Sequence, residues 1–169
     1  MEPLVGDGVA AVELGNVLVA IWQHPATDAR WDWMKAVMDR TAENSPGGFL
    51  MLDVTAATSS PPDAALRRRM QVDFKENLPR LRMLIVVALG DSLWVSVVRT
   101  IMRAVALLSG QSHRQVVVAT VAEGVAVARK LGATASAAEL TQAVDELSDA
   151  LGVHPPPRRP TQPSDVIRR

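Results

Sequence analysis

The 169-residue sequence contains no cysteine, and this absence excludes disulfide bonds, thiolate nucleophiles and thiolate metal sites. It has no net charge either, because 18 Lys and Arg residues balance 18 Asp and Glu residues. A general nucleic-acid binder needs a basic excess, so we expect no nucleic-acid partner. Tyrosine is also absent, which leaves the aromatic area to four tryptophans and two phenylalanines.

Long apolar runs are missing as well. No run approaches the ~20 residues that a membrane span needs, since Arg99 and Arg103 interrupt the longest candidate, Leu93–Leu108. The first residues, Met1–Asp7, lack the basic segment and apolar segment of a signal peptide. We therefore expect a soluble cytoplasmic protein without a membrane span.

Catalytic motifs are absent too. The three histidines, His24, His113 and His154, lie far apart and none has metal-binding spacing, so we interpret His24 and His113 as surface imidazoles. No serine sits in a Gly-x-Ser-x-Gly elbow, and no glycine-rich phosphate loop is present. We therefore predict that the protein is not an enzyme and uses no cofactor and no metal.

The strongest pattern that is present is an apolar run followed by small polar residues. Phe49–Val54 is apolar apart from Asp53, and such a run is typical of a strand buried on both faces. Farther on, Ser60 with Asp63 resembles a capping box, and Pro61 suits the first helical position. We therefore predict a strand, a loop and a helix that begins after Ser60. In open α/β sheets, binding sites usually lie at such a junction.

The rest of the chain alternates strand and helix patterns. The predicted strands are Gly8–Leu14, Val17–Trp22, Phe49–Val54, Leu81–Leu89 and Val116–Ala119. The predicted helices run from Thr27 to about Thr41, from Pro61 to Pro79, from Leu93 to Ser109, from Thr120 to Gly132 and from Ser136 to about Gly152. Gly15 and Asn16 suit the turn of an antiparallel hairpin, whose first strand we expect at the sheet edge because Glu13 interrupts its apolar pattern. The order predicts an α/β fold, with a mixed sheet and helices packed on it.

This order divides the chain into four parts. Residues 1–7 are an N-terminal extension, residues 8–132 the domain, and residues 133–152 an accessory C-terminal helix. Residues 153–169 are rich in Pro and Arg and lack apolar periodicity, so we predict an extended or disordered tail.

Three segments in this order resemble a STAS domain, the anti-sigma-factor-antagonist or SpoIIAA-like fold. Phe49–Thr55 is similar to the family's apolar strand that ends in Asp, an aliphatic residue and a small hydroxyl residue. Leu81–Gly90 is similar to the next strand, and Val116–Leu131 to the closing strand and helix. The likeness covers about Gly8 to Gly132, and it implies a STAS-like mixed sheet with an N-terminal hairpin.

The resemblance implies a phosphoacceptor at the start of the helix after the Asp-bearing strand. The serines at this position are Ser59 and Ser60. The family pattern places Asp before the serine pair and Gly after it, whereas here Thr58 precedes the pair and Pro61 follows it. The chain therefore looks closer to the uncharacterised bacterial STAS-like proteins than to the signalling type, and the alternative is that Ser60 only caps the helix.

The function implied by the resemblance is a non-catalytic regulatory domain that binds a partner protein through the Thr55–Asp63 loop. The residues expected to form this partner-binding surface are Asp53, Thr55, Thr58, Ser59, Ser60 and Asp63. No second carboxylate or histidine is close to Asp53 in the sequence, which favours an anchor for the loop over a metal ligand.

Two alternatives for the function remain open. Related SEC14-like folds hold lipids, and the helix Leu93–Leu108 has more apolar surface than one sheet face needs, which favours a carrier of a small apolar ligand. The same helix and the apolar stripe of Ser136–Leu151 are also candidates for a homodimer interface.

Two features of the helix surfaces remain. Arg67, Arg68 and Arg69 are candidates for a basic face, and the alternative is a solvated helix face balanced by nearby acids. Trp31 and Trp33 are two residues apart on one helix, so both cannot point at the sheet and one should lie at its rim.

Overall fold

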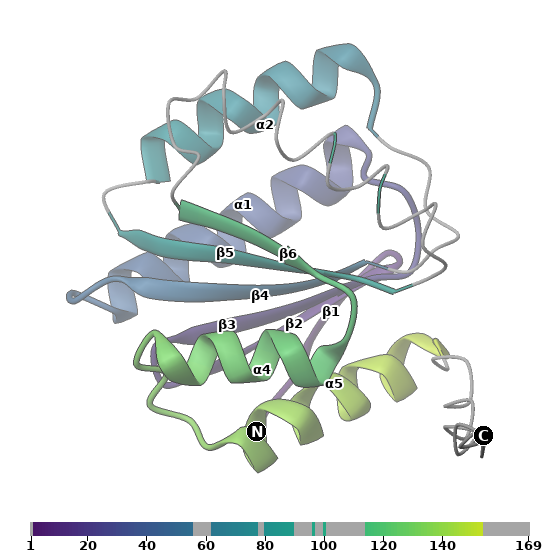
Figure 1. Cartoon of the computed structure of the whole chain (residues 1–169). Helices are drawn as coiled ribbons and strands as arrows, with labels where there is room; N and C mark the ends of the chain where they lie inside the picture. Colours follow the sequence, from purple (N-terminus) through teal and green to yellow (C-terminus); the bar gives the residue numbers. More distant parts are fainter. Residues whose placement is uncertain are drawn as a thin grey trace, which may run out of the picture.

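A six-stranded mixed sheet forms the middle layer of the protein in the computed structural model (Figure 1). The structure describes residues 2–55, 62–77, 80–89, 96, 100 and 114–153. The strands are β1 (Leu4–Gly6), β2 (Val9–Leu14), β3 (Val17–Trp22), β4 (Phe49–Thr55), β5 (Leu81–Ala88) and β6 (Gln115–Val118). They lie in sequence order, with β1–β3 antiparallel and β3–β6 parallel, which confirms the predicted α/β fold with a mixed sheet.

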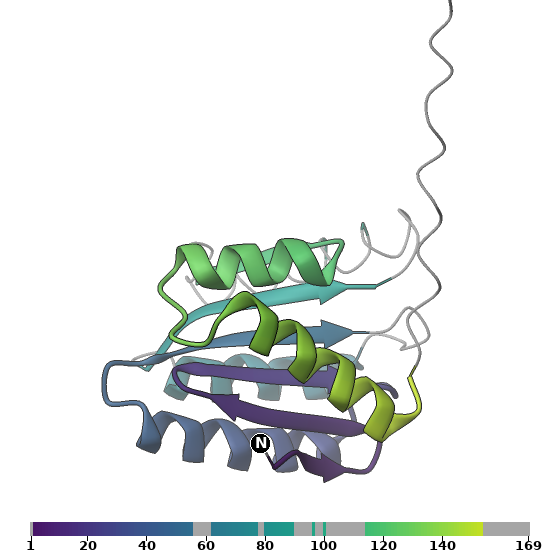
Figure 2. The same cartoon turned by 90° about the horizontal axis from the view of Figure 1, so that it is seen from below.

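Helices cover both faces of this sheet. The described helices are α1 (Asp28–Asn44), α2 (Ala64–Asn77), α4 (Val121–Lys130) and α5 (Ala137–Leu151). Helices α1 and α2 lie on one face because successive parallel strands in sequential order need crossovers on the same side. Figure 2 views the opposite face, where α4 and α5 lie across the sheet.

Both faces of the central strands are buried, which explains their almost continuous apolar sequences. Along β4, Phe49 and Met51 pack under α1 and α2, whereas Leu50, Leu52 and Val54 pack under α4 and α5. Each of these five side chains is at most 2% exposed. A parallel strand covered on two sides has no solvent face on which polar residues would alternate.

The predicted N-terminal hairpin is present. Leu14 pairs with Val17 across Gly15 and Asn16, and only Gly15 of the two has a positive φ, 58°, as in a type II′ turn. Asn16 then joins this turn to the segment between α4 and α5. Its backbone N–H donates to Thr134 Oγ1 (3.2 Å), and its side-chain oxygen accepts from the Thr134 backbone N–H (2.8 Å).

The prediction that the first hairpin strand lies at the sheet edge is wrong. Strand β1 pairs with β2 on its outer side, and Leu4 lies opposite Ala11. A three-residue strand is too short to show an apolar period, so the residues before Asp7 read as an extension. An acidic residue can lie in this inner strand because the Glu13 carboxylate accepts hydrogen bonds from the side chains of Arg40 and Asn44 of α1.

Helix α1 begins where the sequence predicts and ends later. Thr27 is its N-cap and accepts from the backbone N–H of Arg30, and the helix continues to Asn44 rather than ending near Thr41. Trp31 is 1% exposed, whereas Trp33 is half-buried beside Gly6 at the β1 edge. The expected division into one inner and one rim tryptophan is therefore confirmed.

Helix α5 buries its apolar stripe against its own sheet. Leu140, Ala143, Val144 and Leu147 belong to the same core cluster as Ala10, Val12, Val17 and Val19 of β2 and β3. The capping boxes predicted at Thr120 and Ser136 are both present. This stripe is therefore covered within the chain and needs no second copy.

Some predictions concern residues outside the described part. The helix Leu93–Ser109 is one of them, apart from Ser96 and Thr100, and the tail after Val153 is another. The dimer and lipid-carrier predictions that depend on the helix are therefore untested. Among the described residues, no helix combines the length and apolar character required to cross a membrane.

Candidate functional site

The carboxyl ends of β3, β4 and β5 meet at one edge of the sheet, because these strands are parallel neighbours. We call this the carboxyl edge and define its described part by Trp22, Asp53, Thr55, Asp63 and Leu89. It lies on the right in Figure 1. In α/β sheets such edges carry most ligand sites, so this is the first place to look for function.

Asp53 is the ionisable residue of the inner strand β4. Its Oδ1 accepts a hydrogen bond of 2.7 Å from the indole Nε1–H of Trp22, the last residue of β3. Burial raises the pKa of the Asp53 carboxyl to about 7, while the Trp22 hydrogen bond acts in the opposite direction. Asp53 keeps part of its surface accessible, so its proton can exchange with solvent. Among the described residues, its hydrogen-bond donor is an indole and not the backbone N–H that an anchored loop would offer.

Asp63 caps helix α2, which overturns the prediction that Ser60 is the cap. Asp63 Oδ1 accepts from the backbone N–H groups of Ala65 and Leu66, both at 2.8 Å, and the helix begins at Ala64. Asp and Ser are about equally good N-caps, so the pattern alone could not separate them. Asp63 directly precedes the first helical turn, and its side chain forms the N-cap.

Thr55 ends β4 and is tied to the next strand. Its carbonyl oxygen accepts from the backbone N–H of Leu89 at 3.0 Å. Thr55 and Asp53 lie on the same side of β4 because side chains alternate along a strand. The other predicted loop residues, Thr58, Ser59 and Ser60, lie outside the described residues.

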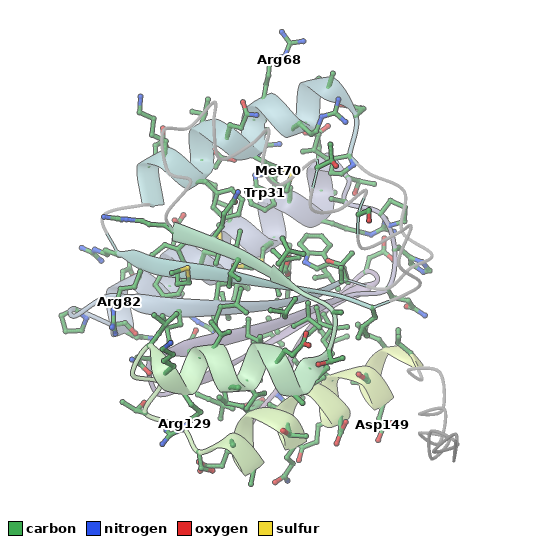
Figure 3. The ribbon with its side chains drawn as sticks, viewed as in Figure 1. Trp31, Arg68, Met70, Arg82, Arg129 and Asp149 are labelled. Carbon is green, nitrogen blue, oxygen red and sulfur yellow. The ribbon has the colours of Figure 1, made fainter. Side chains whose placement is uncertain are left out.

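The three consecutive arginines of α2 do not form one basic face. Arg69 pairs with Asp32 and with Asp28 (3.0 Å) of α1, and Arg67 donates to the carbonyl oxygen of Pro62 at 2.7 Å. Arg68 points away from the body of the protein (Figure 3). Successive residues of a helix point in different directions, so three neighbours cannot share a face.

A second tryptophan–aspartate pair lies between α1 and α2, and the sequence did not reveal it. The indole of Trp31 donates to Asp73 Oδ2 at 2.6 Å, and its ring lies 5.2 Å from that of Phe74. Trp31 and Met70 both lie on the sheet side of α2 (Figure 3). The partners are 42 positions apart, and no local pattern links residues at that separation.

Histidines and metal ligands add nothing to this site. His24 is exposed, as predicted, whereas His113 and His154 lie outside the described residues. Within the described part of the chain, no three His, Cys, Asp or Glu side chains are grouped so that they could hold a metal ion.

Comparison with known proteins gives no family assignment. The sequence matches no protein-family model, and no curated protein matches it at a significant level. The function is therefore inferred from the geometry of the carboxyl edge.

Proposed function

We propose that the protein is a non-catalytic regulatory domain of the STAS-like type, which binds a partner protein through the Thr55–Asp63 loop. The observation that carries the proposal is the β4–α2 junction. The inner parallel strand β4 ends there at Thr55, and the next described element is helix α2, which begins at Ala64 and is capped by Asp63. A loop in this position is presented at the carboxyl edge, between neighbouring strands and a helix N-terminus.

The element order supports the STAS-like part of the proposal. The second strand of the N-terminal hairpin, β3, is followed by three strands that lie parallel to it in sequential order, and the inner strand β4 carries Asp53 near its carboxyl end. The closing strand β6 leads into α4 through the Thr120–Glu123 capping box. These are the features on which the resemblance in the sequence rests.

The Asp63 cap changes how a phosphate in this loop would act. The N–H groups of Ala65 and Leu66 already donate to the Asp63 carboxylate, so they are not available to a phosphate. Phosphorylation of Ser59 or Ser60 would add about 1.5–2 negative charges near that carboxylate. We therefore expect a phosphate to act by repulsion and to release an acidic partner or recruit a basic one.

The test is partner capture from the native host with wild type, Ser59→Ala, Ser59→Asp and Ser60→Ala. Thr141→Ala is the matched control, because Thr141 is exposed on α5 at the opposite face. We expect a partner that wild type and Thr141→Ala retain equally and that at least one loop variant loses. Phosphopeptide mapping of the wild type shows whether either serine is modified. Identical partners for all five proteins would refute the loop as the binding surface.

A further inference from the structure

Basic residues gather at the end of the sheet opposite to the carboxyl edge, where the parallel strands begin. They come from the start of β5, the residue before β6 and the last turn of α4. We call this surface the basic edge, and its members are Arg80, Arg82, Arg114, Arg129 and Lys130. All of them except Arg114 are exposed. Figure 3 shows Arg82 and Arg129 at this end of the molecule and Asp149 toward the other end.

Arg82 joins the β5 part of the basic edge to the α4 part. Its Nη2 donates to the carbonyl oxygen of Leu131 at 2.9 Å, and Leu131 directly follows Arg129 and Lys130. A Cβ atom at Gly132 would lie 3.9 Å from the same nitrogen. The cations of β5 and of α4 therefore lie on one continuous surface.

The other two arginines extend this surface to β6 and α1. Arg114 donates to the carbonyl oxygen of Leu81 at 3.4 Å, between Arg80 and Arg82 in the sequence. Arg80 donates to the carbonyl oxygen of Ala42 near the end of α1 at 3.0 Å. The basic edge therefore reaches from the α1 layer across the sheet to the α4 layer.

These contacts hold the arginines in place without neutralising them. A guanidinium has several N–H donors, and a neutral carbonyl oxygen engages one of them without cancelling the charge. Elsewhere in the described part of the chain arginines pair with acids, as Arg69 does with Asp28. The members of the basic edge that form no ion pair with a described residue are Arg80, Arg82, Arg129 and Lys130.

The acids at this end that are not in ion pairs are fewer than the cations. Glu76 follows a lysine in the last turn of α2, so those two charges cancel. Glu43 of α1 and Glu139 of α5 remain, and Glu139 accepts the backbone N–H of Ser136 at 2.7 Å. Hydrogen bonds from Ser136 are the main cause of the lowered pKa of Glu139, and the charge of Arg129 adds to it. The basic edge therefore keeps an excess of positive charge.

The segments outside the described residues that adjoin the basic edge contain no acid. Residues 78–79, which precede Arg80, are Leu and Pro. Residues 101–113, which precede Arg114, contain one arginine, one histidine and neither Asp nor Glu. These segments add positive charge if they change the balance at all.

The acids in the other undescribed segments do not cancel the excess either. They are Asp91 and Asp165. Asp91 is two positions after Leu89 at the carboxyl edge, and two residues span at most about 7 Å, whereas β5 is about 25 Å long. Asp165 belongs to a tail that carries four arginines.

We propose that the basic edge is a second binding surface of this protein, which takes an acidic segment of a partner protein. The planar fork of arginine matches a carboxylate well. The cations extend over both helix layers, so a single small anion would engage only part of them. Glu43 and Glu139 lie among them and disfavour a nucleic acid, whose phosphates are evenly spaced. The surface lies opposite to the Thr55–Asp63 loop and does not depend on the function proposed for that loop.

The first test is an NMR titration of the full-length, 15N-labelled protein with a poly-glutamate peptide at low ionic strength. Gly48 and Gly132 lie beside the Arg82 side chain, so their amide resonances should shift and saturate. Added salt should reverse the shifts, because exposed charges are screened. The amide of Gly152, close to the arginine-rich tail, reports on binding by the tail instead.

The second test removes single charges. Arg80→Gln, Arg82→Gln and Lys130→Gln should each weaken peptide binding by up to about fivefold, and the three together by about tenfold or more. Glutamine keeps an N–H group that can donate to the carbonyl oxygens. The matched control is Arg68→Gln, because Arg68 is exposed on α2 and also donates to a backbone carbonyl oxygen, that of Ala64 at 3.3 Å. Peptide binding by this control should equal that of the wild type.

Several outcomes would overturn the proposal. They are the absence of saturable binding, shifts confined to Gly152, and equal weakening by Arg68→Gln. Tighter binding of a single-stranded oligonucleotide of equal charge, lost in the triple variant, would assign the surface to nucleic acid instead. Each variant must give a dispersed spectrum, and exposed Lys130→Gln keeps the test valid if an arginine variant does not fold. Ser59→Ala should bind the peptide like the wild type, so failure of the loop proposal would leave this surface standing.

Discussion

At the scale of single residues, Asp53 couples protein stability to pH. Its pKa is about 7 in the folded protein and 3.8 when unperturbed. Between these values the folded protein holds a proton that the unfolded chain has released. The contribution of Asp53 to stability is therefore fully present below about pH 3.8, falls as the pH rises and is lost above about pH 7.

The first prediction is that Asp53→Asn removes this dependence. Asparagine keeps an oxygen that can accept the Trp22 N–H but cannot ionise. The free energy of unfolding should therefore stay level for the variant between about pH 5 and pH 8, apart from contributions of other groups. At about pH 8 the variant should exceed wild type by about 1–3 kcal/mol. Urea unfolding of the two proteins at several pH values measures the pH dependence of each and the difference between them. Parallel pH curves for the two proteins would contradict the prediction.

The second prediction concerns the buried Trp31–Asp73 bond. Trp31→Phe keeps an aromatic ring beside Phe74 but leaves the Asp73 oxygen without its indole donor. Because Asp73 is 8% exposed, we expect a loss of about 1–3 kcal/mol in the free energy of unfolding. Trp33→Phe is the matched control, since Trp33 is only half-buried at the β1 edge. Equal losses for both variants would mean that ring size matters and the hydrogen bond does not.

At the scale of elements, α2 and α4 are held in place in different ways. Helix α2 is held partly by polar contacts, since Arg69 is paired with acids of α1 and Trp31 is bound to Asp73. Helix α4 approaches the sheet directly at Gly124, where the absence of a side chain permits the contact. Salt should therefore weaken the attachment of α2 more than that of α4.

The third prediction tests the close approach of α4. A Cβ atom at Gly124 would lie 2.7 Å from Val87 Cγ2 and 2.9 Å from Leu52 Cδ1. Alanine favours a helix by up to about 1 kcal/mol over glycine, but overpacking typically costs about 1–3 kcal/mol. We therefore expect Gly124→Ala to lower the free energy of unfolding in urea. Gly47→Ala is the control, because a Cβ there meets nothing within 4 Å. A stabilised Gly124→Ala protein would show that α4 can move outward at little cost.

At the scale of the whole molecule, the sequence predicted what local rules decide. The inner strands follow from apolar runs buried on both faces, and the hairpin follows from Gly15 and Asn16. The starts of three helices follow from single capping residues, which are Thr27, Thr120 and Ser136. Each of these signals lies within a few neighbouring positions.

The missed features depend on contacts between distant segments or on competing local signals. Trp22 reaches Asp53 across 31 positions, and β1 acquires its role only by pairing with β2. The start of α2 was missed because both Ser60 and Asp63 suit a cap. The candidate site was therefore predicted as a place in the fold, whereas its hydrogen bonds and its charge balance required the structure.

The last prediction asks whether α5 is an accessory helix or part of the domain. Leu140 and Leu147 of α5 are at most 1% exposed and cover β2 and β3, so a chain that ends at Gly132 would expose one face of these strands. Removing two such leucines from a core typically costs about 2–5 kcal/mol each, which is comparable to the stability of a whole domain. We expect the chain ending at Gly132 to self-associate or lose its near-UV circular dichroism. The chain ending at Val153 keeps α5 and serves as the control, which should unfold at the same temperature as the full-length protein. A stable monomer ending at Gly132 would make α5 the accessory helix that the sequence predicts.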